Sequence, residues 1–379
     1  MLKKMDKTLL IVSIMLLIIG LIMVFSASNV TSFMKIKKTP YYFFNRQLFL
    51  LIVSFIASLI IIRVNTKAYG YISWGLILVF IGLLIAVLVY GKIINQARSW
   101  INIFGIKFQP SEFVKIATIV WMSFFVTGKR KQGFKGYLFM FAIIGLIAVL
   151  IILQPDLGTA TIYLGIVFMM FMSLDISKKI KRNILLTGAG LGALVIILLM
   201  NNGVQVFFAR QMERFDFSRP CSEEKFYTTG TQLCNGFIAF NNGGLTGLGL
   251  GNSTQKYLYL PEAYTDFIFA ITVEELGLIV SIIILLMMLI VLWRIFLIAK
   301  HATTDRGRLM CVGVFWYILI HIVVNLGGVM GIIPLTGVPL PFLSYGGSFL
   351  ICLVIALTIV QRVNIETRID LQDSIDKLA

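Results

Sequence analysis

Long stretches of apolar residues, separated by short polar segments, dominate the chain. Four of them approach or exceed the roughly 17 residues that a helix needs to cross a hydrocarbon core: Leu9–Phe25, Leu48–Ile62, Ile72–Tyr90 and Ile279–Trp293. The whole pattern predicts about ten transmembrane helices, near residues 8–28, 43–62, 70–90, 111–127, 136–153, 157–174, 184–200, 266–293, 309–331 and 342–361. We therefore expect an all-α integral membrane protein.

Two longer polar segments complete the predicted organisation. Residues 201–265 form a long loop between the seventh and eighth helices, and residues 362–379 form a tail. No internal repeat and no second soluble domain is visible, so we expect one polytopic membrane domain over residues 1–379. Composition agrees, because charged residues make up 13% of the chain, whereas a soluble domain has about 25%.

The positive charge of the chain reports its topology. Lys and Arg exceed Asp and Glu to give a formal net charge of +16, but they gather in short loops rather than on a basic surface. With a cytoplasmic N-terminus, the cytoplasmic segments hold 20 Lys and Arg and the short outer loops hold 7. This asymmetry predicts that both termini are cytoplasmic and that residues 201–265 are extracellular. We expect no nucleic-acid partner.

The segment Phe108–Lys115 is the first polar cluster on the predicted outer side. Polar groups at membrane depth are costly and usually face a cavity or a partner. Pro110 suits a helix start, and the hydroxyl of Ser111 is available to cap it. Glu112 and Lys115 follow three residues apart on one helix face. They form either a purely structural ion pair or part of a constellation that holds a charged ligand.

Two aspartates stand at predicted helix starts. Asp156 follows Pro155 and can cap the helix that begins at 157, a role that requires no further function. Asp266 precedes a long apolar helix that Thr265 could cap equally well, so the local structure does not demand its carboxylate. Glu274 lies about 12 Å deeper along that helix. We favour a functional role for Asp266.

Two irregular segments flank these candidates. Asn241–Ser253 contains five glycines in nine residues, but it lacks the Gly-Lys-Ser/Thr ending and the preceding strand of a phosphate-binding loop. Close backbone packing is the better interpretation. Pro334–Gly347 contains three prolines and three glycines. This segment predicts a re-entrant turn that walls a cleft, because irregular backbone is tolerated at membrane depth only where protein or a cavity surrounds it.

Seven segments follow one another from the first predicted helix to the last: Gly20–Ser28, Ala97–Trp100, Phe108–Glu112, Gln154–Thr159, Tyr259–Phe269, Glu274–Gly277 and Leu343–Ser348. In this order they resemble the FtsW/RodA/SpoVE (SEDS) family of shape, elongation, division and sporulation proteins. Each match is weak alone, but together they cover nearly the whole chain.

The resemblance implies a peptidoglycan glycosyltransferase of the bacterial cytoplasmic membrane that polymerises lipid II, an undecaprenyl-pyrophosphate-linked disaccharide peptide. It also implies a class B penicillin-binding protein as partner, together with other divisome or elongasome proteins. Asp266 is then the essential catalytic carboxylate. The implied substrate-binding residues are Arg46, Arg98, Glu112, Lys115, Asp156 and Ser344.

The implied chemistry assigns Asp266 as the general base and Arg46, Arg98 or Lys115 as the groups that stabilise the departing pyrophosphate. A divalent cation, Mg²⁺ or Mn²⁺, could share that work. The sequence shows no dedicated metal cage, so it predicts no ligands for such an ion. A lipid II flippase and a divisome scaffold without activity remain the alternatives, and the absence of an inverted repeat disfavours the flippase.

Within the family, the Gln109–Lys115 segment, the Gly-rich loop and Thr254–Ala263 resemble the FtsW division branch more closely. Val338–Pro341 resembles the RodA elongation branch as much. Two positions depart from the family pattern, since Arg219 stands where the division branch usually has Asp and Tyr264 where His is common. Neither departure removes a group that the chemistry needs.

The chain has four cysteines and no CxxC or CxxH spacing that would suggest a metal site. Cys221 and Cys234 lie together in the predicted extracellular loop, where a disulfide between them is possible. Cys311 and Cys352 lie in apolar stretches, where we expect them to be packing residues.

Overall fold

A computed structural model describes residues 4–94, 97–103, 106–128, 133–201, 219–226, 228 and 230–377; of these, residues 92–94, 97, 98, 103, 106, 189 and 191–201 are described by their backbone alone. Each of the ten predicted membrane segments coincides with a helix, namely α1 (Lys7–Val30), α2 (Tyr42–Ile61), α3 (Thr66–Tyr90), α4 (Pro110–Thr127), α5 (Phe134–Ile152), α6 (Leu157–Met172), α7 (Lys178–Asn201), α11 (Ile268–His301), α12 (Asp305–Val329) and α13 (Gly347–Asp376). A short π-helix, η2 (Thr31–Lys35), extends α1.

Seven of the described helices are long and apolar enough to cross a membrane, and α6 is a shorter apolar helix. The predicted all-α membrane fold is therefore confirmed. Side chains in the preceding residue fix several of the helix starts through hydrogen bonds to first-turn N–H groups. Asp6, Asn65, Asp156 and Thr304 cap α1, α3, α6 and α12 in this way.

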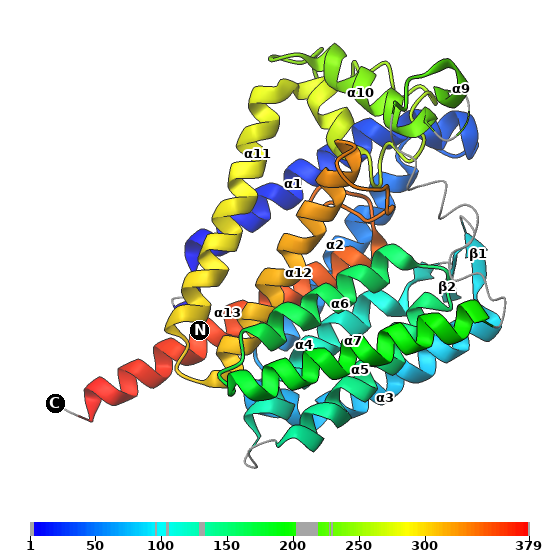
Figure 1. The fold of residues 1–379 in the computed structure, drawn as a ribbon. Coiled ribbons are helices and arrows are strands. Elements are labelled where there is room, and N and C mark those ends of the chain that lie inside the picture. Colours follow the sequence, from blue (N-terminus) through cyan, green and yellow to red (C-terminus); the bar gives the residue numbers. More distant parts are fainter. Residues whose placement is uncertain are drawn as a thin grey trace.

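The helices divide into two groups that α12 and α13 connect (Figure 1). On one side α3, α4, α5 and α6 pack against one another, and α12 contacts both α4 and α6. On the other side α1 and α11 pack together, with α10 (Thr231–Gly243) against α11. The two termini lie at the end of the molecule opposite to α9 (Glu223–Phe226) and α10.

A small antiparallel sheet, which the sequence analysis did not predict, fills the segment between α3 and α4. Its strands are β1 (Lys92–Ile94), β2 (Ala97–Ile103) and β3 (Ile106–Phe108), in the order β1-β2-β3. Ile101 pairs with Phe108 and Asn102 with Lys107. The local alternation of apolar and polar residues favours strands, but each strand is too short to stand out in a chain dominated by long apolar stretches.

The Gly-rich segment packs against a break in α11. Gly277 has φ 81°, so the helix loses its regular hydrogen bonds there. The loop replaces them: the N–H of Leu248 donates to the Glu274 carbonyl at 2.9 Å, and the N–H of Leu278 donates to the Gly244 carbonyl at 3.0 Å. A Cβ atom on Gly277 would lie 2.4 Å from a loop carbonyl oxygen. Close backbone packing thus explains Gly243 and Gly247, where an added Cβ would lie 2.1 and 2.4 Å from carbonyl oxygens of α11, whereas Gly244, Gly249 and Gly251 are explained by their positive φ angles.

The predicted tail is largely a continuation of α13, which runs to Asp376. Its first turns are buried against the loop between α2 and α3. Arg362 Nη1 donates to the Ile62 carbonyl at 3.1 Å, and the N–H of Thr66 donates to Glu366 Oε1 at 2.8 Å. The predicted long loop also contains structure, because the described part of residues 201–265 includes α9 and α10.

Candidate active site

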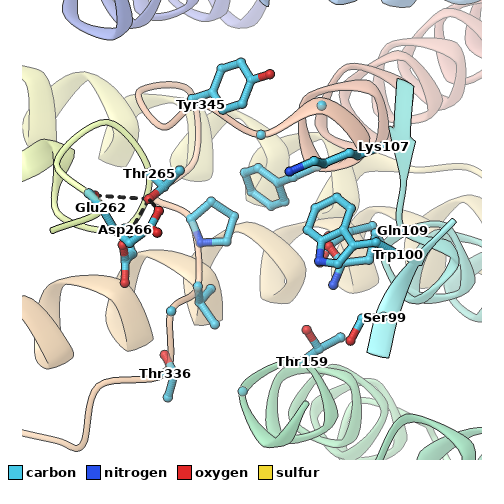
Figure 2. Close-up of a pocket in the computed structure, with 18 of the residues that line it drawn as sticks. Ser99, Trp100, Lys107, Gln109, Thr159, Glu262, Thr265, Asp266, Thr336 and Tyr345 are labelled. Atoms are coloured by element: carbon cyan, nitrogen blue, oxygen red, sulfur yellow. Dashed lines mark hydrogen bonds between the residues drawn. The ribbon is translucent and has the colours of Figure 1, made fainter. Parts of the chain in front are cut away.

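A cavity of about 1160 Å³ lies between the two helix groups. Its walls come from α2, α4, α6 and α12, from β2 and β3, from the irregular segment 333–347 and from the turn that precedes α11. Figure 2 shows acidic residues of that turn on one side and Trp100, Lys107 and Gln109 across from them. The segments that the sequence analysis singled out therefore converge on one cleft.

Asp266 forms one end of this cleft and is 9% exposed. Thr265 Oγ1 lies 3.1 Å from Asp266 Oδ1 and 2.8 Å from Glu262 Oε2, and Gln232 Nε2 donates to Asp266 Oδ2 at 3.4 Å. The N-cap of α11 is Phe267, without a side-chain hydrogen bond, so Thr265 does not cap the helix, although the sequence would have allowed it. The Asp266 carboxylate does not cap the helix either.

Asn325 of α12 fixes the backbone around Asp266. Its Nδ2 donates to the Asp266 carbonyl at 2.8 Å and to the Val338 carbonyl at 2.7 Å, which ties the turn to the irregular segment. A second link joins the N–H of Tyr345 to the Tyr264 carbonyl at 2.9 Å. The predicted re-entrant turn is thus present and forms a wall of the cleft.

Ser344 lies behind that wall and is not among the residues that line the cleft. Its hydroxyl accepts a hydrogen bond from the N–H of Leu340 at 2.8 Å, and its carbonyl accepts one from Gln47 at 3.3 Å. These contacts stabilise the turn. The geometry therefore favours a structural role for Ser344 over the substrate-binding role expected from the sequence.

A fully buried group of charged and polar side chains also lines the cleft. Lys115 Nζ lies 2.8 Å from Glu112 Oε1 and 3.1 Å from His321 Nε2, and all three residues line the cavity. His321 Nδ1 is 2.6 Å from the Tyr317 carbonyl, which can only accept, so Nδ1 carries the proton. Nε2 then accepts from the Lys115 ammonium. His321 is therefore a neutral imidazole that orients Lys115.

The start of α4 differs from the prediction in one detail. Its N-cap is Gln109, with Pro110 following, and the buried Ser111 hydroxyl has no hydrogen-bond partner among the described residues. Gln109 Nε2 instead reaches Asp156 Oδ2 at 3.2 Å, while Asp156 Oδ1 accepts from the N–H of Thr159 at 3.0 Å. Asp156 both caps α6 and lines the cleft.

Two further cationic side chains line the cavity: Arg46, which the sequence analysis named as substrate-binding, and Lys107, which it did not. Arg46 lies over the ring of Tyr42, 4.9 Å from its centroid, and Lys107 projects from β3 toward the cavity (Figure 2). The predicted Arg98 belongs to β2, but its side chain lies outside the described residues.

Five predicted residues therefore meet at one cleft: Arg46, Glu112, Lys115, Asp156 and Asp266. The sequence analysis missed Glu262, Lys107 and His321 as cleft residues. His321 had a usable signal, because it is one of only two histidines and lies in an apolar stretch. Among the described residues, no group of three or more His, Cys, Asp and Glu side chains could hold a metal ion. We assign no ligands to a divalent cation.

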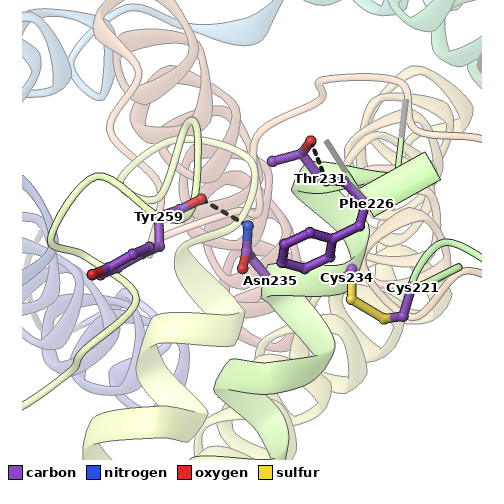
Figure 3. The surroundings of a disulfide bond; sticks show 6 residues. All are labelled: Cys221, Phe226, Thr231, Cys234, Asn235 and Tyr259. Atoms are coloured by element: carbon purple, nitrogen blue, oxygen red, sulfur yellow. Dashed lines mark hydrogen bonds between the residues drawn. A yellow bond between two sulfur atoms is a disulfide. The ribbon is translucent and has the colours of Figure 1, made fainter. Parts of the chain in front are cut away.

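A disulfide between Cys221 and Cys234 braces the region of α9 and α10 (Figure 3). The two Cα atoms are 5.1 Å apart, and the bond ties the segment before α9 to α10. Asn235 Nδ2 of α10 donates to the Tyr259 carbonyl at 2.9 Å. Since α10 also carries Gln232, these contacts hold the group that donates to Asp266.

Comparisons with known proteins agree with one another over almost the whole chain. A family model described as "Cell cycle protein" (FtsW/RodA/SpoVE) matches residues 6–369. A protein of Bacillus subtilis (strain 168) named "Probable peptidoglycan glycosyltransferase FtsW" is 34% identical, with 96% of this chain and 91% of that protein covered. The "Stage V sporulation protein E" of the same organism is 36% identical, with 95% and 96% covered.

Two solved structures share the fold. A chain of a peptidoglycan synthase complex superposes with a TM-score of 0.73 at 23% identity, covering 95% of this chain and 97% of that one. The rod shape determining protein RodA of Thermus thermophilus superposes with a TM-score of 0.68 at 22% identity, covering 95% and 96%.

Proposed function

The chain belongs to the FtsW/RodA/SpoVE family of cell cycle proteins, and on this premise we propose that it is a peptidoglycan glycosyltransferase that polymerises lipid II in the cleft beside Asp266. The observation that carries the proposal is the presence, in one cavity of about 1160 Å³, of a nearly buried carboxylate and several cations. Glycosyl transfer from a pyrophosphate needs both kinds of group.

In the proposed reaction, the 4-hydroxyl of GlcNAc on one lipid-linked disaccharide attacks C1 of MurNAc on another, and undecaprenyl pyrophosphate leaves. A hydroxyl is a poor nucleophile until a base removes its proton, and a positioned carboxylate contributes about 10²–10⁴-fold. Asp266 is the base we assign. Burial and the neighbouring charge of Glu262 raise the pKa of Tyr264, so its phenol stays protonated and cannot compete for this role.

The leaving pyrophosphate gathers negative charge that cations stabilise in a site with little water. Arg46 and Lys107 line the cleft and can approach such a group. Lys115 is already paired with Glu112, and the two charges of this buried ion pair cancel. We therefore assign Lys115 a role in positioning the substrate rather than in stabilising the pyrophosphate. Arg98 remains a candidate for stabilising the pyrophosphate.

The chain is a multi-pass membrane protein, and we propose that the cleft opens toward the outer face of the cytoplasmic membrane. The excess of Lys and Arg in the predicted cytoplasmic loops supports this orientation. Both termini also lie at one end of the molecule, as cytoplasmic termini would (Figure 1). We propose a class B penicillin-binding protein as partner, in keeping with the structural likeness to a chain of a peptidoglycan synthase complex.

A detergent-based assay tests the proposal against the flippase alternative. The purified chain, with its cognate class B penicillin-binding protein blocked at the transpeptidase site, would be given labelled lipid II. Because micelles have no two leaflets, only polymerisation can consume the substrate, and we expect glycan strands longer than one disaccharide. Unchanged lipid II, together with its translocation by the same protein in vesicles, would establish the flippase instead.

A further inference from the structure

Two carboxylates meet at a single hydroxyl beside the Asp266 end of the cleft (Figure 2). Thr265 Oγ1 lies 2.8 Å from Glu262 Oε2, 3.1 Å from Asp266 Oδ1 and 3.1 Å from the Glu262 carbonyl oxygen. A hydroxyl carries one proton and two lone pairs, so it can donate to only one of these oxygens at a time. The shortest contact assigns the Thr265 proton to Glu262 Oε2. The side of Thr265 that faces Asp266 is then an acceptor.

The contact between Thr265 and Asp266 becomes a hydrogen bond only when a proton lies between the two oxygens. With the Thr265 proton directed at Glu262, that proton has to come from Asp266. The arrangement therefore suits Asp266 in its protonated form, which is the form that exists directly after Asp266 has acted as a base. The three side chains make a continuous path from Asp266 Oδ1 through Thr265 Oγ1 to Glu262 Oε2.

The difference in burial between the two carboxylates indicates that a proton moves along this path from Asp266 to Glu262. Asp266 is 9% exposed, whereas Glu262 is only partly buried, and both line the cleft. Glu262 also has φ 53°, a left-handed conformation that residues with a side chain rarely adopt. Its carbonyl accepts from the N–H groups of Thr265 and Phe267 at 3.2 and 3.3 Å, so the chain folds back. This turn brings the Glu262 carboxylate to the Thr265 hydroxyl, and unfavourable backbone conformations of this kind cluster at functional sites.

We propose that Thr265 and Glu262 form a proton relay that restores Asp266 after each sugar is added. Asp266 takes the proton of the attacking hydroxyl as the glycosidic bond forms and the bond from C1 to the pyrophosphate oxygen breaks. Asp266 then gives this proton to Thr265 Oγ1 while the original Thr265 proton moves to Glu262 Oε2. Glu262 releases it to water, and the Thr265 hydroxyl rotates back. Thr265 and Glu262 act through Asp266 and touch no reacting atom.

This inference rests on the proposed function, and its test uses the full chain with its partner penicillin-binding protein and lipid II. Glycan synthesis by Thr265→Val is measured against formate concentration at fixed pH and ionic strength. We expect a loss of about tenfold at low formate, which is smaller than the roughly 10²-fold minimum for a group that takes the proton directly from the substrate, and recovery as formate carries the proton instead. Glu262→Gln should behave in the same way. Thr265→Ser keeps the hydroxyl and should match the wild type without formate.

Thr272→Val is the matched control, because Thr272 is a buried threonine of α11 outside the cleft whose hydroxyl donates to the Ile268 carbonyl at 2.8 Å. It should show neither a loss nor a formate effect. The relay is overturned if Thr265→Val works at the wild-type rate, or if its loss persists at every formate concentration. Asp266→Asn, assayed alongside, separates the two proposals: if it stays active, the assignment of the base fails, whatever the relay variants do.

Discussion

Asp266 and the pair Glu274–Glu275 lie at the same end of α11 and have opposite surroundings. Glu274 and Glu275 are fully buried, and protein groups surround their oxygens. Glu274 accepts from the hydroxyl of Thr254 at 2.8 Å and from Asn242 at 3.0 Å, and Glu275 pairs with Lys256 at 2.9 Å. Asp266, by contrast, faces a cavity large enough for a sugar.

The comparison shows that burial alone does not identify a reactive carboxylate. Glu274 and Glu275 satisfy the expectation that buried charges are paired or hydrogen-bonded, and they hold the Gly-rich loop against the break in α11. Asp266 has cleft access and a hydroxyl neighbour that suits proton transfer. We therefore assign a catalytic role to Asp266 and a structural role to Glu274 and Glu275.

The substitution Asp266→Asn is expected to have the largest effect, a loss of catalytic activity. The substitution keeps the shape and hydrogen-bonding capacity of the side chain but removes the base. We expect strand synthesis to fall at least about 10²-fold, with the melting temperature in detergent unchanged. Turnover and thermal unfolding are the two measurements. Retention of more than about a tenth of wild-type turnover would contradict the assignment.

Removal of the disulfide between Cys221 and Cys234 tests how far the region of α9 and α10 supports the Asp266 end of the cleft. Cys221→Ser with Cys234→Ser should destabilise the protein by about 3 kcal/mol in the chain-entropy model for a loop near this length. Thermal unfolding of the double variant measures this loss. Cys311→Ser, a change at a buried free cysteine outside the loop, serves as the control for thiol removal. Full labelling of Cys221 and Cys234 by an alkylating reagent in the folded, unreduced protein would show that the bridge is absent.

Glu274→Gln should affect stability rather than chemistry. The amide cannot accept hydrogen bonds at both terminal atoms, so donors among Thr254, Asn242 and Ser253 lose their partner. Hydrogen bonds to charged groups contribute about 1.5–3 kcal/mol each, and we expect a destabilisation of about 2 kcal/mol. A melting temperature equal to that of the wild type would show that Glu274 is not a structural anchor.

The smallest effect concerns His321, which accepts a hydrogen bond from Lys115. His321→Leu removes this acceptor, and at about 1.5 kcal/mol, the lower value for a hydrogen bond to a charged group, we expect turnover to fall about tenfold. His321→Gln offers another acceptor and should recover most of the activity. His301, the second histidine, lies exposed at the far end of α11, and His301→Leu is the matched control. Equal losses for His321→Leu and His321→Gln would rule out the positioning role.

The sequence predicted the helices and most of the cleft. Continuous apolar stretches report membrane helices directly, and Asp156 and Asp266 were found because they stand next to such stretches. The deep ion pair was also predictable, since Glu112 and Lys115 are three residues apart on one helix.

Contacts between segments that are distant along the chain could not be predicted from the sequence. His321 reaches Lys115 across 206 positions, and Ser344 turns its hydroxyl to the Leu340 N–H rather than to the cleft. Glu262 was visible in a matching segment, but only the turn made by its left-handed backbone brings its carboxylate to Thr265. These features depend on tertiary packing and on local backbone geometry that residue types alone do not specify.

The measurement that tests the central claim most directly compares Asp266→Asn with Glu274→Gln in the lipid II polymerisation assay. Turnover is expressed per folded molecule, so that lost stability is separated from lost chemistry. We expect Glu274→Gln to stay within about twofold of the wild type and Asp266→Asn to fall at least about 10²-fold below it. Equal turnover of the two variants per folded molecule would contradict the claim that Asp266 is the catalytic base and that Glu274 has a structural role.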